Sequence, residues 1–431
     1  METSADGYNY RRTRFLVSRT PDPGRDRAAL ASCVASCVAL FVPLFVAAAV
    51  LVAATLADVA AAGPAAAARP NRASALTAAI KQVMRQTSIP GVIVGVWQPG
   101  VAPYVKAFGV RNKATGRPMT TDLHLRIGSE TKTFTITAVL QLVDQGKVGL
   151  DDPIGNYLSG VPNGNEITIR QLAEMRSGLV SYTTSEAWSQ AYQSNPLRPW
   201  TPQELLPYSF SQPLLFAPGT QFNYSNTNTI LLGLLVEKVS GQSLSAFISQ
   251  HILKAEGLTH TSFPAGAAIP SPYAQGYSKQ TPNGKLANVT KWNPAWAWAA
   301  GSMISTIADL HTWARVVATG TLLTPATQQQ REVFLPVVEE PPMTYGLALF
   351  NINGWLGHNG SIPGYQSLTV YLPSSKATMV VLMNTDANPP DHELTTVVGR
   401  AITKIITPKH IFYFSKADSG SAPTTTAPPA H

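Results

Sequence analysis

The sequence predicts an α/β (α+β) domain whose antiparallel sheet is built from both ends of the domain, is flanked by helices and carries a mostly helical inserted subdomain. Short β-rich segments occur at 91–110 and again at 344–383. The stretch between them, from about 151 to 298, is helical and loop-rich in pattern. Because a sheet must bury a face against other elements, strands at the two ends fit best as one sheet with the helical segment inserted between them. The boundary between two such parts is a usual place for a cleft.

The first elements are predicted to be a helix and a strand hairpin. Residues 74–87 have apolar side chains at helical spacing, and Ser74 suits the N-cap position. Gly91–Trp97 and Tyr104–Val110 are rich in strand-forming residues, and a Pro-Gly pair between them predicts a turn. Further along, Phe134–Val143 is strongly apolar and long enough for a buried helix.

The C-terminal part returns to short β-rich segments and ends in a helix. The predicted strands are Thr344–Phe350, Trp355–His358, Ser367–Leu372 and Ala377–Met383, and the predicted closing helix is His392–Ile406. A proline and two serines between the last two strands predict a turn. Together these elements assign residues 73–412 to the folded domain.

The two ends of the chain differ from the domain in composition. Residues 1–27 are basic, 28–57 contain no charged side chain, 58–72 form an Ala/Pro linker, and 413–431 have the Ser/Thr/Pro/Ala bias of a disordered tail. An uncharged run of this length is ample for a signal-peptide core or a membrane span. The arginines before it predict a cytoplasmic N-terminus and a domain outside the cytoplasmic membrane. The domain is then either membrane-anchored through 28–57 or secreted after cleavage.

Composition excludes several classes of function. The formal net charge of +8 is mild for 431 residues, and the lysines and arginines are scattered, so no nucleic-acid partner is expected. Both cysteines, Cys33 and Cys37, fall in the apolar run, which leaves the domain without a thiol for a disulfide, a metal site or a nucleophile. The eight histidines show no metal-ligand spacing, and neither HExxH nor GxSxG occurs. No metal and no other cofactor is expected.

A serine and a lysine at helical spacing are the first candidate for chemistry. Ser129-Glu130-Thr131-Lys132 is the one SxxK in the chain, and it opens the apolar helix segment. Residues three apart share a helix face, so the Ser129 hydroxyl and the Lys132 amine are predicted to come within hydrogen-bond reach. A serine hydroxyl needs a base to become a nucleophile, and a buried lysine with a lowered pKa can be that base. A helix cap beside a solvated lysine is the alternative interpretation.

Two further motifs follow along the chain. Tyr224-Ser225-Asn226 is the one YxN and lies just before an apolar helix. Its tyrosine can pass a proton and its asparagine amide can bind a substrate amide, and a capping loop is the alternative. His358-Asn359-Gly360 ends a predicted strand, where Gly360 would let a substrate lie close to the backbone; a plain strand-end turn is the alternative.

The three motifs, in the order SxxK, YxN and HxG, resemble those of the serine β-lactamase and penicillin-binding D,D-peptidase superfamily. The resemblance is strongest to class C β-lactamases and to HxG-type D,D-carboxypeptidases, and it covers most of residues 75–405. It implies a β-lactamase/transpeptidase-like fold and an exported serine hydrolase that acts through an acyl-enzyme. It also implies that water releases the acyl group in a second step.

The resemblance assigns a role to each motif residue by its position. Ser129 would be the acylated nucleophile, with Lys132 and Tyr224 sharing its proton, and Asn226 would hold the substrate amide. His358 would be a proton partner or an orienter. The backbone N–H groups of Ser129 and Ser361 would form the oxyanion hole.

One departure from the family pattern concerns the terminal carboxylate of the substrate. In HxG-type D,D-peptidases a basic residue after the Tyr-Gly-x-Gly-Leu stretch can hold that carboxylate, whereas Phe350 follows the corresponding stretch here. A carboxylate moved out of water without replacement donors is disfavoured. The departure predicts a preference for esters, or for amides without a free carboxylate, with the ring of Phe350 packing on the leaving group.

The expected substrates are therefore small esters, amides or peptidoglycan-derived D-amino-acid peptides, and β-lactams are candidate ligands. The alternative function is a membrane-anchored wall-binding or β-lactam-sensing module with little or no turnover. Intact motifs favour the enzyme, because a non-catalytic relative would be expected to lose Ser129 or Lys132.

Overall fold

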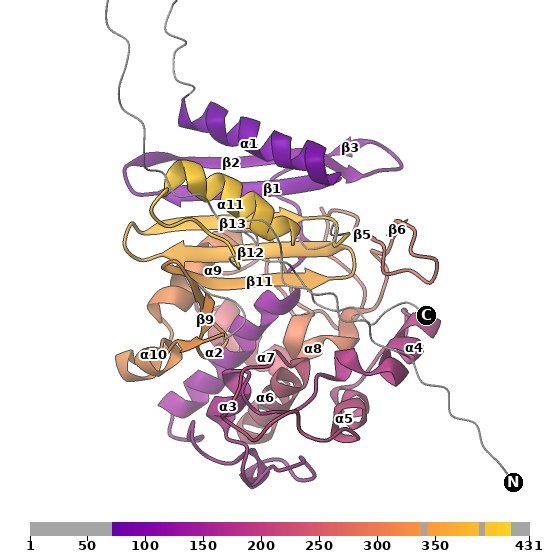
Figure 1. Ribbon diagram of the computed structural model, residues 1–431, viewed down its shortest axis with the longest axis vertical. Helices are drawn as coiled ribbons and strands as arrows, with labels where there is room; N and C mark the ends of the chain where they lie inside the picture. The colour runs from indigo at the N-terminus through magenta and orange to yellow at the C-terminus, as the bar shows by residue number, and fades with distance from the viewer. Residues whose placement is uncertain (1–70, 338–342, 388–392, 415–431) are drawn as a thin grey trace, which may run out of the picture. The chain divides into compact units, whose positions relative to one another are not determined.

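The computed structural model describes residues 71–337, 343–387 and 393–414 (Figure 1). The predicted apolar segment 28–57, the basic segment before it and most of the linker and tail lie outside the described residues. Within the described residues no single helix has both the length and the apolarity of a membrane span. Asn226–Ser240 and Leu244–Leu253 reach that length and composition only when taken together, as a pair bent by 79°.

A nine-stranded sheet forms the centre of the described domain, in the order β3-β2-β1-β13-β12-β11-β10-β9-β8. Its strands are β1 (Gly91–Gln98), β2 (Val101–Asn112), β3 (Arg117–Pro118), β8 (Leu335–Pro336), β9 (Met343–Tyr345), β10 (Phe350–Ile352), β11 (Trp355–Ile362), β12 (Tyr365–Leu372) and β13 (Ala377–Met383). Neighbours are antiparallel, and β1 pairs with β13 with Val92 opposite Met383. The two ends of the domain therefore meet at the middle of one sheet, which confirms the predicted architecture.

Two helices from opposite ends of the domain cover one face of the sheet. Figure 1 shows α1 (Arg72–Thr87) and α11 (Leu394–Ile406) side by side over β13 and its neighbours. The side chains of Leu76, Ile80 and Val83 recur at spacings of four and three and are buried in this layer. The predicted N-cap is one correction: Asn71 caps α1, since its side chain accepts a hydrogen bond from the Ser74 nitrogen at 2.9 Å.

The opposite face packs against α9 (Ile307–Thr319), beyond which lies α2 (Thr131–Asp144). Alternation along the strands separates the two cores, since Ile93 belongs to the core with α9 while Val92 and Val94 belong to the core with α1.

The inserted part contains α3 (Ile169–Ala173), α4 (Glu186–Ser194), α5 (Pro202–Phe210), α6 (Asn226–Ser240), α7 (Leu244–Ile248) and α8 (Trp298–Gly301), and α10 (Pro325–Arg331) follows α9. Two small sheets, β4 (Leu125–Arg126) with β7 (Ile304–Ser305) and β5 (Tyr277–Ser278) with β6 (Ala287–Asn288), lie outside the nine-stranded sheet.

Two of the differences between predicted and observed strands bear on the site. The predicted strand Thr344–Phe350 is split into β9 and β10 by a tight turn, in which the Gly346 nitrogen donates to the Leu349 carbonyl at 2.8 Å and Ala348 has a φ of 53°. The predicted Trp355–His358 is too short, because β11 continues through Gly360 to Ile362. The HxG motif therefore lies inside a strand, and the strand-end turn considered for it is wrong.

Candidate active site

Ser129 lies on a short helical turn that connects β4 to the buried helix α2. The turn η1 (Gly128–Glu130) runs directly into α2, and α2 is buried as its apolar composition predicts. Every residue from Leu123 to Leu140 is buried except Ser129, which is half-buried. Ser129 is therefore the one side chain of this segment that a substrate can reach.

Lys132 is fully buried one helical turn after Ser129 and makes three hydrogen bonds. Its Nζ donates to Ser129 Oγ at 3.0 Å, to Asn226 Oδ1 at 2.8 Å and to the Ala300 carbonyl at 2.8 Å. All three acceptors are uncharged. Because burial penalises the ammonium form, the pKa of Lys132 is lowered well below its usual value. In its neutral form the amine has two N–H groups for Asn226 and Ala300, and its lone pair can accept the proton of Ser129. The predicted contact between Ser129 and Lys132 is confirmed, and the solvated-lysine alternative is wrong.

Tyr224 reaches the same hydroxyl from the other side of the site. It lies just before α6, its residue is 37% exposed, and its ring lies 4.8 Å from Lys132 Nζ. Burial of the phenol raises the pKa of Tyr224, and a hydrogen bond with Ser129 offsets part of that rise. The phenol therefore keeps its proton at neutral pH.

The opposite pKa shifts of Lys132 and Tyr224 separate their roles. A lowered lysine pKa favours a proton acceptor, and a raised tyrosine pKa favours a proton donor. Lys132 is thus suited to take the proton of Ser129 during attack. Tyr224 is suited to give a proton to the leaving group and to take one back from the water that deacylates the enzyme.

Asn226 begins α6 and has both ends of its amide engaged. Its Oδ1 accepts from Lys132, and its Nδ2 donates to Thr183 Oγ1 at 3.2 Å. The Ser181 hydroxyl in turn accepts from the Asn226 nitrogen at 3.1 Å. Asn226 therefore fixes Lys132 against the loop before α4, and a substrate amide would have to share or displace the contact with Thr183.

His358 is buried on β11 and is neutral. Its Nδ1 lies 2.6 Å from the Asn359 carbonyl oxygen, so Nδ1 carries the proton, and Nε2 accepts from the Tyr345 hydroxyl at 3.0 Å. Burial lowers the pKa of His358 to about 3, although the hydrogen bond with the Asn359 carbonyl raises it in part. Of the two predicted roles, the geometry fits the orienter, since both ring nitrogens are engaged away from Ser129.

β11 passes directly behind the nucleophile turn. A Cβ added to Gly128 would lie 2.7 Å from the Ser361 backbone nitrogen, which shows how closely the two segments approach. The backbone nitrogen of Ser361 thus lies against the residue that precedes Ser129, a placement consistent with an oxyanion hole formed by the two N–H groups. Gly360 has a different function from the predicted one, because its Cβ would meet the Ile127 carbonyl oxygen at 1.9 Å. The close backbone neighbour of Gly360 is this chain and not a substrate.

The prediction for Phe350 is wrong. Its side chain is 1% exposed and packs in the core under α1 and α11, with ring centroids 5.6 Å from His358 and 5.8 Å from Phe414. A residue buried at this depth cannot contact a leaving group. Phe350 instead packs beside His358 within the core.

Three residues of the site were not singled out from the sequence. Gly128, Thr183 and the Ala300 carbonyl each contact the motif residues directly. Gly128 could have been identified from the sequence, because it is the glycine immediately before the SxxK serine. Thr183 and Ala300 had none, because a single threonine or backbone carbonyl far along the chain carries no pattern.

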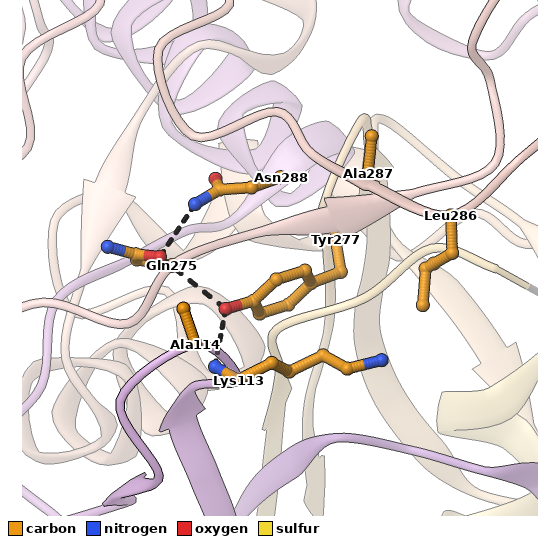
Figure 2. A pocket seen from close by; sticks show the side chains of 7 residues that line it. All are labelled: Lys113, Ala114, Gln275, Tyr277, Leu286, Ala287 and Asn288. Carbon is orange, nitrogen blue, oxygen red and sulfur yellow. Dashed lines mark hydrogen bonds between the residues drawn. The ribbon is translucent and has the colours of Figure 1, made fainter.

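A cavity of about 320 Å³ lies elsewhere and contains none of the motif residues (Figure 2). It is lined by Lys113, Ala114, Gln275, Tyr277, Leu286, Ala287 and Asn288. Its polar groups bond to one another, since Tyr277 Oη accepts from the Lys113 nitrogen at 2.7 Å and Asn288 Nδ2 donates to Gln275 Oε1 at 2.6 Å. Among the described residues no group of histidines and carboxylates is arranged to hold a metal ion.

The fold and the Ser129–Lys132–Tyr224 site define a serine hydrolase of the β-lactamase-like type, and comparison with known proteins gives the same class. Residues 76–403 match the Beta-lactamase family, and the chain belongs to that family. It is a serine hydrolase fold related to penicillin-binding proteins and D-amino acid amidases.

Three relatives illustrate the relationship. A D-stereospecific amidohydrolase from Streptomyces is 30% identical with a TM-score of 0.70, covering 79% of this chain and 99% of its own. The D-amino acid amidase of Ochrobactrum anthropi is 25% identical with a TM-score of 0.66, covering 73% and 92%. Protein flp of Staphylococcus aureus is 28% identical over 71% of this chain, which spans only 61% of flp.

Proposed function

We propose that this protein hydrolyses amides and esters of D-amino acids, and short D-amino-acid peptides, through an acyl-enzyme on Ser129. The observation that carries the proposal is the hydrogen bond of 3.0 Å from Lys132 Nζ to Ser129 Oγ, with Tyr224 at the same hydroxyl. The D-configuration is taken from the two amidases that resemble the chain over most of their length. The acyl-enzyme divides the hydrolysis into two easier steps.

The charge of the leaving group further restricts the class of substrate that we expect. Lys132 Nζ lies at hydrogen-bond distance from Ser129, Asn226 and Ala300, and as a neutral amine it carries no charge. Lys132 is therefore not free to pair with a carboxylate on the leaving group. This favours amides and esters over peptides with a free C-terminus, and it replaces the argument that rested on Phe350.

The substrate preference can be measured directly. We expect kcat/KM for D-phenylalanine amide to exceed that for the L-amide and for a peptide ending in D-Ala-D-Ala by at least about tenfold, which is ~1.4 kcal/mol of transition-state stabilisation. A preference for the L-amide would contradict the proposed configuration. A preference for the D-Ala-D-Ala peptide would show that another cation reaches the leaving group. Arg126 would then be examined first, because its Nη1 has no hydrogen-bond partner among the described residues.

Turnover separates the enzyme from a β-lactam sensor. A penicillin should acylate Ser129, and the amide substrate should turn over many times per active site. A protein that is labelled by penicillin and releases no amide product beyond one equivalent would support the sensing module instead.

We also propose that the domain works outside the cytoplasmic membrane. The support is sequence only: arginines precede the uncharged run 28–57, as the positive-inside rule requires for an exported C-terminal part. An alkaline phosphatase reporter fused after Pro70 should be active, and a reporter that works only in the cytoplasm should be silent. The reverse pattern would refute export.

A further inference from the structure

Glu130, the residue after the nucleophile, is a buried carboxyl that the mechanism above does not use. Its residue is 1% exposed, neither carboxyl oxygen makes a hydrogen bond of normal geometry among the described residues, and the hydroxyls of Thr369 and Ser367 favour its ionised form only in part. An unpaired buried carboxylate is among the least favourable arrangements in a protein interior. Glu130 therefore needs an explanation that a surface glutamate would not.

The side chains that surround Glu130 are apolar or uncharged. It lines a small space together with Thr133 from α2, Trp313 and Val317 from α9, His358 from β11 and Thr369 from β12. The gaps between these described side chains have no room for a water molecule. Thr369 Oγ1 also lacks a partner among the described residues, so a protonated carboxyl could donate to it.

The charged and titratable groups around this space do not compensate a carboxylate. His358 faces the same space from β11 and is neutral, and α9 and β12 contribute no charge there. Lys132 points from α2 to Ser129, Asn226 and Ala300. Arg331 from α10 is bound to Thr133 and Thr137, with its guanidinium donating to oxygen atoms of α2. None of these cations makes an ion pair with Glu130.

Burial accordingly raises the pKa of Glu130 to about 8, although the hydroxyls of Thr369 and Ser367 lower it in part. Near neutral pH the side chain is an uncharged acid. It lies next in sequence to Ser129, on the turn that carries the N–H group assigned to the oxyanion hole. A negative charge there would oppose the oxyanion and would also favour the protonated form of Lys132.

We propose that Glu130 is a positioning residue that must stay uncharged for acylation, and that its ionisation switches the site off at alkaline pH. This inference rests on the proposed function of Ser129. The uncharged carboxyl packs between α2 and β11, the strand that carries His358. While Glu130 is protonated, it places no negative charge next to Ser129. Such a charge would repel the oxyanion and would favour the protonated form of Lys132.

The test is the pH profile of Glu130→Gln, which has the same shape and cannot ionise. In the wild type, the acylation rate should fall by at least about tenfold over two pH units on the alkaline side, as a single inhibitory ionisation requires. In Glu130→Gln that fall should disappear, while the rate near neutral pH stays within about threefold of wild type. Glu174→Gln is the matched control, because Glu174 is a buried carboxyl outside the site, and it should leave the wild-type profile unchanged.

The pH dependence of folding stability gives a second measurement of the protonation of Glu130. A carboxyl whose folded pKa is raised from 4.5 to about 8 binds more protons in the folded than in the unfolded state across that window. Wild-type stability should therefore fall relative to Glu130→Gln as the pH rises from 4.5 to about 8, and the difference should level off above it.

The outcomes separate this inference from the proposed function. An alkaline limb that persists unchanged in folded Glu130→Gln would overturn the inference, while acylation of Ser129 would still support the function. Absence of any acylation in the wild type would overturn the function. If Glu130→Gln does not fold, infrared spectra of the wild type decide: a protonated carboxylic acid band should vanish over the pH range in which acylation falls, and its absence would refute the inference.

Discussion

Lys132→Met should reduce the rate of Ser129 acylation by about 10²- to 10⁴-fold, the range that general-base catalysis contributes. Methionine has a similar length and fits a buried site, but it cannot accept the serine proton. The variant also leaves Asn226 Oδ1 and the Ala300 carbonyl without their donor, so some loss of stability is expected as well. The measurement is the acylation rate with an ester substrate, together with the melting temperature.

Lys147→Met is the control for this change. Lys147 is exposed and lies in the Lys147-Val148-Gly149 sequence, which also fits [HK]xG but precedes the YxN motif. Its replacement should leave acylation unchanged. If folded Lys132→Met retains more than about a tenth of the wild-type acylation rate, Lys132 is not the base.

Gly128→Ala should have an effect of similar size through the oxyanion hole. The new Cβ would lie 2.7 Å from the Ser361 nitrogen and 2.9 Å from its carbonyl carbon and oxygen. These are backbone atoms, so the clash can be relieved only by moving β11 away from the nucleophile turn. Loss of one oxyanion-hole donor lowers kcat by about 10²- to 10³-fold, and we expect a loss of that order.

Gly116→Ala controls for backbone strain. Gly116 has a φ of 66° and Gly128 a φ of 50°, so both are left-handed, but a Cβ at Gly116 meets nothing within 4 Å. Gly116→Ala should therefore lower stability slightly and leave kcat unchanged. Equal kcat values for the two variants would mean that contact between Gly128 and Ser361 does not shape the site.

Much of the architecture could be predicted because hydrophobic patterns and turn residues are local signals. The strand Ala377–Met383 is observed with the predicted bounds, and the pairing of β1 with β13 joins the chain ends as expected. The wrong N-cap of α1 arose because two nearby residues offer the same capping chemistry. Asn71 and Ser74 can both cap a helix, and their order on the turn depends on where the chain enters it.

The catalytic motifs could be predicted for a different reason. Ser129 and Lys132 are three residues apart on one helix, so local geometry alone brings them together. The position of Phe350 depends instead on a turn that splits the predicted strand and reverses which face its side chain occupies. Gly360 was assigned to substrate contact because a glycine permits close approach, but the sequence does not say which backbone approaches.

Glu130 illustrates what the sequence alone could not supply. In the sequence it is the second residue of SxxK, a position that exposed glutamates often take at the start of a helix. The structure buries it between α2 and β11 without a partner among the described residues. Its burial follows from packing against strands more than two hundred residues away in the chain, which no local pattern encodes.

The most direct measurement is intact-mass analysis with peptide mapping after exposure to a fluorophosphonate and, separately, to a penicillin. Ser129 acting as the nucleophile predicts one adduct per molecule with each reagent, located on Ser129, and no adduct in a folded Ser129→Ala variant. An adduct on another residue, or labelling that survives in folded Ser129→Ala, would contradict the assignment of Ser129 as the nucleophile.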